Sequence, residues 1–254
     1  MMRGDHWEML HGRYQDVMND VTCDAWIGDT PYSSTTHSGH DAMTESDNAK
    51  MRRAITYPAW TPDDVRECVS FWSPRTRGWF VTITDDVLAP HWRAALADAG
   101  RYAFSPLAYV VHGSRFRMAG DGPAQWSLWI VVARPKREPY SKWGALPGAY
   151  VQPAGELSGH RAGDHKREIG GKDDWIMRRL VADYSRPDDV VCDPCAGWGT
   201  TGAAALREGR SFIGSESRES AFAVSCKRLS ETSFQPSLFN PSKAKQAKIT
   251  LDLP

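Results

Sequence analysis

The fold class is decided by the stretch Val190-Val191-Cys192-Asp193-Pro194-Cys195-Ala196-Gly197-Trp198-Gly199-Thr200-Thr201-Gly202. A short apolar run leads into a glycine-containing turn, and the residues after the turn are typical of a helix. Gly197 and Gly199 predict a backbone that passes close to a ligand, because a Cβ atom there would block the approach. The start of the helix presents free backbone N–H groups to the same place. The stretch therefore predicts a strand–turn–helix corner that binds a ligand.

An acidic residue supports this interpretation. Glu216 follows a second apolar run at residues 212–214, about twenty residues after the glycines. An acid at the end of a second strand can hold the ribose hydroxyls of a nucleoside cofactor. No lysine follows the glycines, which argues against a phosphate-binding loop of the Walker type. A dinucleotide fingerprint wants a third glycine for helix packing, and the pattern matches it imperfectly. A plain structural corner without a ligand is the remaining alternative.

A second constellation stands near the start of the chain. Asp29-Thr30-Pro31-Tyr32 follows an apolar run at residues 25–28. This position is the carboxyl end of a predicted strand, where open α/β sheets bind their ligands. The motif is short enough to arise by chance, so its meaning depends on the glycine turn.

Strands and helices alternate along the chain, which predicts an α/β fold with a doubly wound, mostly parallel sheet and helices on both faces. Strands are expected at residues 7–10, 25–28, 79–84, 107–111, 127–133, 190–192 and 212–214. Helices are expected at residues 14–19, 61–72, 90–99, 173–184, 200–208 and 218–230. Thr61 is the expected cap of its helix and Pro62 its first residue. Residues 33–59 and 136–171 are expected to be loop or irregular structure, and residues 234–254 a tail.

Composition bounds the other properties. The 254 residues carry no net formal charge, so bulk charge does not by itself indicate a nucleic-acid partner. The five cysteines are an odd number in a chain too large to need disulfides, and no signal peptide is visible, so we expect a cytoplasmic protein. The longest apolar run, residues 126–133, is too short to span a membrane. Cys192 and Cys195 lack a second cysteine pair, and we expect no metal.

The two motifs together resemble the permuted β group of the amino-directed DNA methyltransferases. That family reads Asp-Pro-Phe-Ala-Gly-Ser-Gly-Thr-Thr at its cofactor turn, where this chain reads Asp-Pro-Cys-Ala-Gly-Trp-Gly-Thr-Thr from Asp193 to Thr201. Its catalytic Asp/Ser/Asn-Pro-Pro-Tyr/Phe motif precedes the cofactor turn, as Asp29 to Tyr32 does here. Leu10-His11-Gly12 and the segment from Lys172 to Tyr184 are also similar to the family. The resemblance covers most of residues 7–230.

The resemblance implies a circularly permuted, Rossmann-like fold and S-adenosylmethionine as cofactor. Residues 1–135 would be the catalytic half with the loop at 33–59, residues 136–170 a target recognition segment, and residues 171–233 the cofactor half of the same domain. The implied cofactor residues are Lys172, Asp193, Pro194, Ala196, Gly197, Gly199, Thr200, Thr201 and Glu216.

The implied chemistry is methylation of an exocyclic amino group of a base flipped out of the duplex. The Asp29 carboxylate and the Thr30 carbonyl would accept hydrogen bonds from that amino group, Pro31 would stiffen the turn, and Tyr32 would offer a stacking face. An Asp at the head of the motif is commoner in the adenine N6 enzymes of the family, so we expect adenine, with cytosine N4 as the alternative.

Five positions depart from the family pattern. Arg13 stands after Gly12 where the family often has Asp. Thr30 replaces the first proline and is expected to loosen the turn, Cys195 replaces Phe, and Trp198 replaces Ser. Asp173 follows Lys172 where the family has Pro. Rival hypotheses are a non-catalytic nucleic-acid-binding relative, the same chemistry on RNA or on a protein glutamine, and another nucleotide-dependent α/β enzyme.

Double-stranded DNA is the expected partner, and a homodimer that reads a symmetric site is a further hypothesis. The tail sequence Gln235-Pro236-Ser237-Leu238-Phe239 resembles the peptide by which bacterial proteins dock on the sliding clamp. The candidate DNA-contacting residues are Arg52, Arg53, Lys136, Arg137, Arg161, Lys166 and Arg167.

Overall fold

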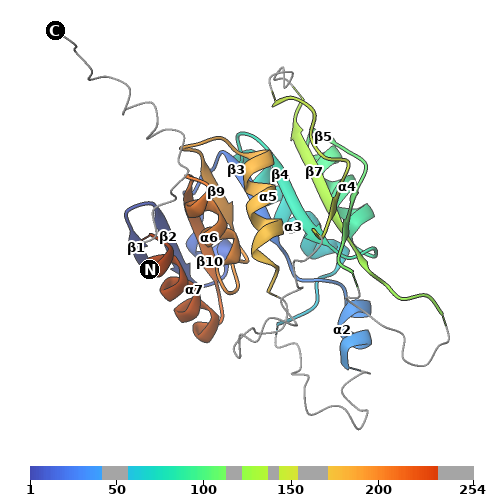
Figure 1. Cartoon of the computed structure of the whole chain (residues 1–254), viewed down its shortest axis with the longest axis horizontal. Coiled ribbons are helices and arrows are strands. Elements are labelled where there is room, and N and C mark those ends of the chain that lie inside the picture. The colour runs from blue at the N-terminus through green and yellow to red at the C-terminus, as the bar shows by residue number, and fades with distance from the viewer. Residues whose placement is uncertain (42–56, 113–121, 137–142, 154–170, 234–254) are drawn as a thin grey trace.

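The computed structural model describes residues 1–41, 57–112, 122–136, 143–153 and 171–233 (Figure 1). The strands are β1 (Met2–Gly4), β2 (Trp7–His11), β3 (Ala25–Asp29), β4 (Phe80–Thr84), β5 (Arg101–Ala103), β6 (Leu107–Val110), β7 (Ser127–Pro135), β8 (Ala149–Val151), β9 (Val190–Asp193) and β10 (Ser211–Glu216). The helices are α1 (Tyr14–Val17), α2 (Ser34–Asp41), α3 (Pro62–Trp72), α4 (Ala89–Asp98), α5 (Asp174–Tyr184), α6 (Thr200–Arg207) and α7 (Glu219–Ser233), with a 3₁₀ turn at Ser73–Arg75.

One mixed sheet organises these elements in the order β1-β2-β10-β9-β3-β4-β7-β6-β8, and β5 pairs with β7. The five central strands, from β2 to β4, are mutually parallel, as the alternation of strands and helices predicts. β7 runs antiparallel to β4, β5 and β6, and β1 runs antiparallel to β2. Strands from both ends of the chain are interleaved, so the two predicted halves share one sheet.

Helices cover both faces of this sheet. Figure 1 shows α5, α6 and α7 over one face, with α3 and α4 over the other. The strands alternate accordingly: Ile27 packs under α5–α7, whereas the neighbouring Trp26 packs against α3 and α4 and stacks on Phe80 at 4.1 Å. Each fully buried side chain of this size contributes about 1.5–3 kcal/mol. The sheet is therefore fixed from two sides, which gives its strand ends a rigid geometry.

The start of α3 follows the predicted local signals. Thr61 is the N-cap and Pro62 the first residue, and the Thr61 hydroxyl accepts a hydrogen bond from the backbone of Asp64. The Asp64 carboxylate in turn accepts from the backbone N–H of Thr61 at 2.8 Å, which completes a capping box.

Two stretches differ from the expectation of loop. Ser34–Asp41 forms α2, and the reason is tertiary: the buried Asp85 carboxylate after β4 accepts hydrogen bonds from Ser33 and Thr36 at its first turn. The helix dipole also stabilises a carboxylate at the N-terminus of a helix. Within residues 136–171, Ala149–Val151 forms β8 and pairs in parallel with β6. The prediction of irregular structure is therefore wrong for both stretches.

Candidate functional site

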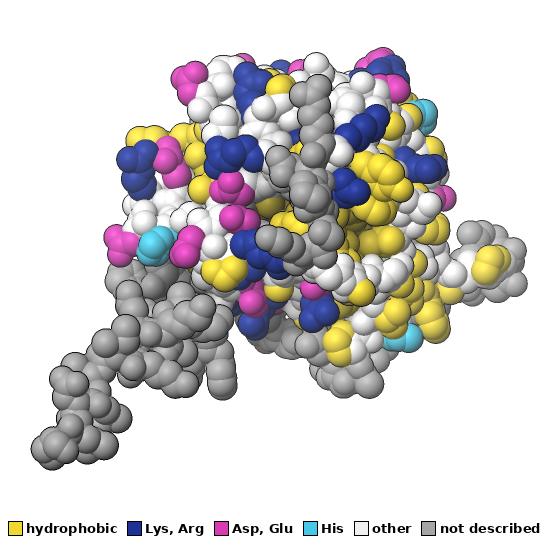
Figure 2. All heavy atoms as spheres, turned by 90° about the horizontal axis from the view of Figure 1, so that it is seen from above, with side chains coloured by type: hydrophobic (Ala, Val, Ile, Leu, Met, Phe, Trp, Pro, Cys, Tyr) yellow, Lys and Arg dark blue, Asp and Glu magenta, His cyan; other side chains and the backbone are white. Residues whose placement is uncertain are grey.

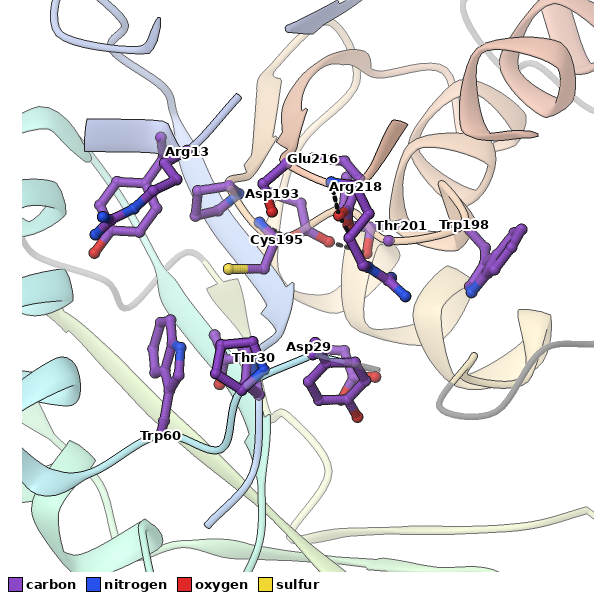
Figure 3. Close-up of a pocket in the computed structure, with 18 of the residues that line it drawn as sticks. Arg13, Asp29, Thr30, Trp60, Asp193, Cys195, Trp198, Thr201, Glu216 and Arg218 are labelled. Atoms are coloured by element: carbon purple, nitrogen blue, oxygen red, sulfur yellow. Dashed lines mark hydrogen bonds and ion pairs between the residues drawn. The ribbon is translucent and has the colours of Figure 1, made fainter. Parts of the chain in front are cut away.

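A cavity of about 520 Å³ opens at the carboxyl ends of the parallel strands (Figure 3). It lies where β9 continues through α6 to β10 on one side, while β3 continues through α3 to β4 on the other. Such a divergence leaves a crevice, and open α/β sheets bind their ligands there. The volume is in the range of small-molecule sites.

The turn after β9 forms one wall of the cavity. Gly197 has φ 50°, a left-handed conformation that side chains disfavour, and a Cβ atom there would meet only the Cys195 carbonyl oxygen, at 3.9 Å. The backbone at Gly197 therefore faces open cavity, as predicted. Gly199, with φ 74°, does not line the cavity; a Cβ atom there would lie 2.9 Å from Ser225 of α7. Its lack of a side chain serves helix packing instead of ligand approach.

Gly202 supplies the third glycine that the pattern seemed to lack. A Cβ atom at this position of α6 would lie 2.7 Å from side-chain carbons of Phe212 and Leu229. Gly202 thus allows α6 to approach β10 and α7, which is the packing role of the third glycine in a G-x-G-x-x-G turn. The prediction of an imperfect match was wrong on this point.

Asp193, at the end of β9, holds the turn in shape. Its Oδ1 accepts a hydrogen bond from the Cys195 backbone at 3.0 Å, and its Oδ2 accepts one from the Thr201 hydroxyl at 2.6 Å. Burial, with smaller contributions from Asp29 and Glu216, raises the pKa of Asp193 to about 7, against the effect of these hydrogen bonds. The Asp193 carboxyl group thus links the two ends of the turn by hydrogen bonds, and it binds a proton more tightly than an ordinary aspartate.

Glu216 ends β10 and lines the same cavity, as predicted for an acid after the second strand. It is nearly buried, and its Oε1 accepts hydrogen bonds from the Arg218 backbone at 2.8 Å and from the Arg218 guanidinium at 3.2 Å. Arg218 also lies over the ring of Tyr57 at 5.6 Å. These contacts fix the carboxylate at the cavity wall (Figure 3).

The turn after β3 forms the opposite wall. Asp29 Oδ1 accepts a hydrogen bond from the Tyr32 hydroxyl at 2.9 Å, and Asp29 Oδ2 lies 2.7 Å from Lys172 Nζ. Burial raises the pKa of the Asp29 carboxyl, while the charge of Lys172 and both hydrogen bonds oppose that rise. Tyr32 itself is buried and does not line the cavity, so the predicted stacking face is covered in this structure.

Thr30 is tethered to the sheet. Its buried hydroxyl hydrogen-bonds that of Thr82 on β4 at 3.2 Å. A proline at this position has no such group, so the side chain supplies a restraint of its own where we expected only a looser turn. Thr30 and Pro31 both line the cavity.

The two motifs meet across the sheet at Gly28. A Cβ atom built there would lie 3.1 Å from Asp193 Oδ1, so the missing side chain lets β3 approach the carboxylate of β9. Strand pairing thus brings residues that are far apart in the sequence to one cavity. The predicted cofactor residues that line it are Lys172, Asp193, Pro194, Ala196, Gly197, Thr200, Thr201 and Glu216.

Sequence reasoning missed several functional neighbours. Tyr57 and Trp60 line the cavity, and the Trp60 backbone donates a hydrogen bond to the Tyr32 carbonyl at 2.9 Å. Burial raises the pKa of Tyr57 to about 12. The signal for this wall is the pair of aromatic residues in Tyr57-Pro58-Ala59-Trp60, at the end of the loop expected at residues 33–59.

Most of the departures from the family pattern also lie at the cavity. Cys195 and Trp198 both line it, and burial raises the pKa of the Cys195 thiol well above its ordinary value, which disfavours the reactive thiolate. Cys192 is buried on the face of the sheet that α3 and α4 cover. Within the described part of the chain, no group of three or more His, Cys, Asp or Glu side chains is placed to hold a metal ion.

Most predicted DNA-contacting residues lie outside the described residues: Arg52, Arg53, Arg137, Arg161, Lys166 and Arg167, as do Gln235 to Phe239. Lys136 is described, and it lies away from the cavity. β7 runs antiparallel to β4, so the strand end that Lys136 follows is opposite to the cavity. Figure 2 views the molecule from that edge, where Lys and Arg side chains lie among acidic and hydrophobic ones.

The helices of the described ranges are all too short or too polar to cross a bilayer. Chemically, the cavity combines hydrogen-bond acceptors on two walls with aromatic side chains at Tyr57 and Trp60. Three of its carboxyl groups, Asp29, Asp193 and Glu216, end parallel strands and suit a ligand that carries positive charge and hydroxyl groups. The glycine turn and Glu216 can hold a nucleoside, and Asp29 lines the same cavity from the turn after β3.

Comparison with known proteins agrees with this geometry. A family model described as DNA methylase, of the N6/N4 methyltransferases, matches residues 163–227. The DNA adenine methyltransferase YhdJ of Escherichia coli (strain K12) is 40% identical over 58 residues, which are 23% of this chain and 20% of that protein. This relative and three others that the chain matches are each covered over a quarter of their length or less.

Two solved structures show the fold. The M1.HpyAVI–SAM complex superposes with a TM-score of 0.63 at 18% identity, over 88% of this chain and 99% of that one. The cytosine-N4-specific PvuII DNA methyltransferase superposes with a TM-score of 0.62 at 13% identity, over 95% and 91%. Residues 163–227 of this chain are thus similar to the N6/N4 DNA methyltransferases, and its fold is that of the two solved methyltransferase structures.

Proposed function

We propose that this protein transfers a methyl group from S-adenosylmethionine to the exocyclic N6 of adenine in DNA. The observation that carries the proposal is the meeting of Asp29 and Thr30 with the glycine turn and Glu216 in one cavity. The S–CH₃ bond breaks as the N–CH₃ bond forms, the sulfonium becomes a neutral thioether, and the amino nitrogen loses one proton to solvent.

The cavity fits this cofactor. The open backbone at Gly197 leaves space that a Cβ atom would fill, and the buried Glu216 carboxylate suits a pair of ribose hydroxyls. The acidic walls suit the positive charge of a sulfonium and an ammonium group. S-adenosylmethionine supplies an electrophilic methyl group, so the protein needs to bind, orient and exclude water.

Asp29 and the Thr30 carbonyl serve the acceptor amine. The lone pair of that nitrogen is delocalised into the base, and two hydrogen-bond acceptors on its protons favour a more tetrahedral, nucleophilic nitrogen. Asp29 must be ionised for this, because a protonated carboxyl loses an acceptor site. Tyr32 and Lys172 each contact one oxygen of the carboxylate and hold it in place. Tyr57 and Trp60, which line the cavity, offer stacking faces for a flipped base.

Adenine is favoured over cytosine by the Asp at the head of the motif and by the adenine-methylating relative. The likeness to the PvuII enzyme supports cytosine N4 as the second candidate. Both amines need the same two acceptors, so the product must be identified directly.

The test offers labelled S-adenosylmethionine with unmethylated duplex DNA and, separately, with an equal mass of RNA, followed by digestion to nucleosides and mass spectrometry. We expect label in N6-methyldeoxyadenosine. Label in N4-methyldeoxycytidine would overturn the choice of base, and label in RNA alone would overturn the choice of nucleic acid. Absence of both transfer and cofactor binding, with DNA binding intact, would favour the non-catalytic alternative.

The finer assignments of partners belong to the same proposal. We propose that the enzyme acts in the cytoplasm and that two copies read a symmetric site; sedimentation that finds only monomer on a palindromic duplex would contradict the dimer. Docking on the sliding clamp through Gln235–Phe239 predicts that Leu238→Ala with Phe239→Ala abolishes capture of the enzyme by immobilised clamp. The division into residues 1–135, 136–170, 171–233 and 234–254 stays a proposal.

A further inference from the structure

An ion pair joins the two halves of the cavity. Lys172 Nζ lies 2.7 Å from Asp29 Oδ2, and the two residues are 143 positions apart in the sequence. The side chains are only 11% and 20% exposed, so water screens the pair little. Lys172 Nζ also lies 4.9 Å from the centroid of the Tyr32 ring, whose hydroxyl donates to the other oxygen of Asp29. Lys172 thus contacts the catalytic turn directly.

The surroundings of Asp29 make this cation important. Asp193 and Cys195 face it from the turn after β9, Tyr57 faces it from the segment before α3, and Tyr32 donates to it from its own turn. These groups are acidic or neutral. Burial raises the pKa of the Asp29 carboxyl, and the charge of Lys172 is the largest influence in the opposite direction.

We propose that Lys172 is a positioning residue for methyl transfer, which keeps Asp29 ionised and oriented toward the base instead of binding the cofactor. This inference rests on the proposed function. The resemblance to the family had assigned Lys172 to the cofactor, whereas its contact with Asp29 assigns it to the acceptor amine. A buried carboxyl without this cation takes up a proton, and a protonated Asp29 is a poor acceptor for the amino group.

Three variants separate charge from hydrogen bonding and from shape. Lys172→Met keeps the length of the side chain without charge or donor, Lys172→Gln keeps a donor without charge, and Lys172→Arg keeps the charge. Lys227→Met is the matched control, because Lys227 lies on α7, is 77% exposed and pairs only loosely with Glu231 at 3.8 Å.

The experiment measures kcat/KM for methyl transfer to duplex DNA between about pH 5 and pH 9, where the acidic limb reports the essential base of the free enzyme. Loss of an opposite charge raises a carboxyl pKa by about 1–3 units, so we expect the acidic limb of Lys172→Met and Lys172→Gln to move up by that amount. Activity should recover at high pH. Lys172→Arg should stay near the wild type in its pH profile, and Lys227→Met should equal it.

Cofactor affinity, measured by calorimetry on the same proteins, distinguishes the two roles. We expect Lys172→Met to bind S-adenosylmethionine within a few-fold of the wild type, which also shows that the variant is folded. An unshifted acidic limb together with weakened cofactor binding would overturn the inference and return Lys172 to the cofactor. So would a Lys172→Gln profile that matches the wild type. If the wild type transfers no methyl group, the proposed function fails, and this inference fails with it.

Discussion

Asp193 gives this protein an unusual dependence of stability on pH. The carboxyl group is buried and its pKa is raised from 3.8 to about 7, with burial as the main cause. Asp193→Asn removes the titration and leaves the shape. The amide oxygen can still accept from the Cys195 backbone, and the amide nitrogen can donate to the Thr201 hydroxyl, which now accepts.

The sign follows from proton linkage. The folded state binds the Asp193 proton more tightly than the unfolded state, so its contribution to stability is full below pH 3.8 and is lost as pH rises through about 7. From about pH 5 to about pH 8 that loss is roughly 2.5 kcal/mol, at 1.36 kcal/mol for each pKa unit. Asp193→Asn has no such contribution. The unfolding free energy of the wild type minus that of the variant should therefore fall by this amount as pH rises from about 5 to about 8.

The assay is urea unfolding of the cofactor-free proteins at several pH values within that range. Taking the difference between wild type and Asp193→Asn cancels the titration of all other groups. Asp98→Asn, which removes an exposed carboxyl at the end of α4, is the matched control. A flat difference for Asp193→Asn, or one that grows with pH, would refute the reasoning, because it would mean that the hydrogen bonds outweigh burial.

Three further substitutions test the structure. Gly202→Ala places a methyl group 2.7 Å from Leu229, so we expect a loss of about 1–3 kcal/mol in urea unfolding; unchanged stability would show that α6 does not pack closely. Thr30→Val breaks the hydrogen bond to Thr82, which should cost about 1 kcal/mol of stability and lower kcat while leaving cofactor affinity intact. Glu216→Gln weakens a charged hydrogen bond to the ribose, so calorimetry should find S-adenosylmethionine bound about 10–100-fold more weakly; equal affinity would remove Glu216 from the cofactor site.

Features encoded locally could be predicted from the sequence. The capping box at Thr61 lies within four residues, and the central strands carry their own apolar pattern, so α3 and the parallel core agree with expectation. The carboxyl-end positions of Asp29 and Glu216 follow from the same strands, which is why the pocket could be anticipated.

Features that depend on distant contacts could not be predicted. The sequence of α2 is rich in Ser, Thr and His and has little helical preference, and its first turn is held by Asp85 from the end of β4. The three-residue strands β1, β5 and β8 exist through their pairing. Lys136 was judged by charge alone, and only the direction of β7 reveals that it lies at the far edge.

The hardest feature of the site to predict was which residues contact one another. Lys172 was known as a cavity residue only through family resemblance, and its contact with Asp29 requires α5 and β3 to be placed side by side. Gly202 was present in the quoted stretch, yet its role depends on Phe212 and Leu229, which approach it from other elements.

The most direct test of the central claim compares wild type with Asp29→Asn in a single turnover, with cofactor affinity measured on both proteins. We predict that the wild type forms N6-methyldeoxyadenosine and that Asp29→Asn loses at least about 100-fold in rate while binding S-adenosylmethionine within a few-fold. Equal rates of transfer by the two proteins would contradict the account, because the amino group would then not depend on the carboxylate of Asp29.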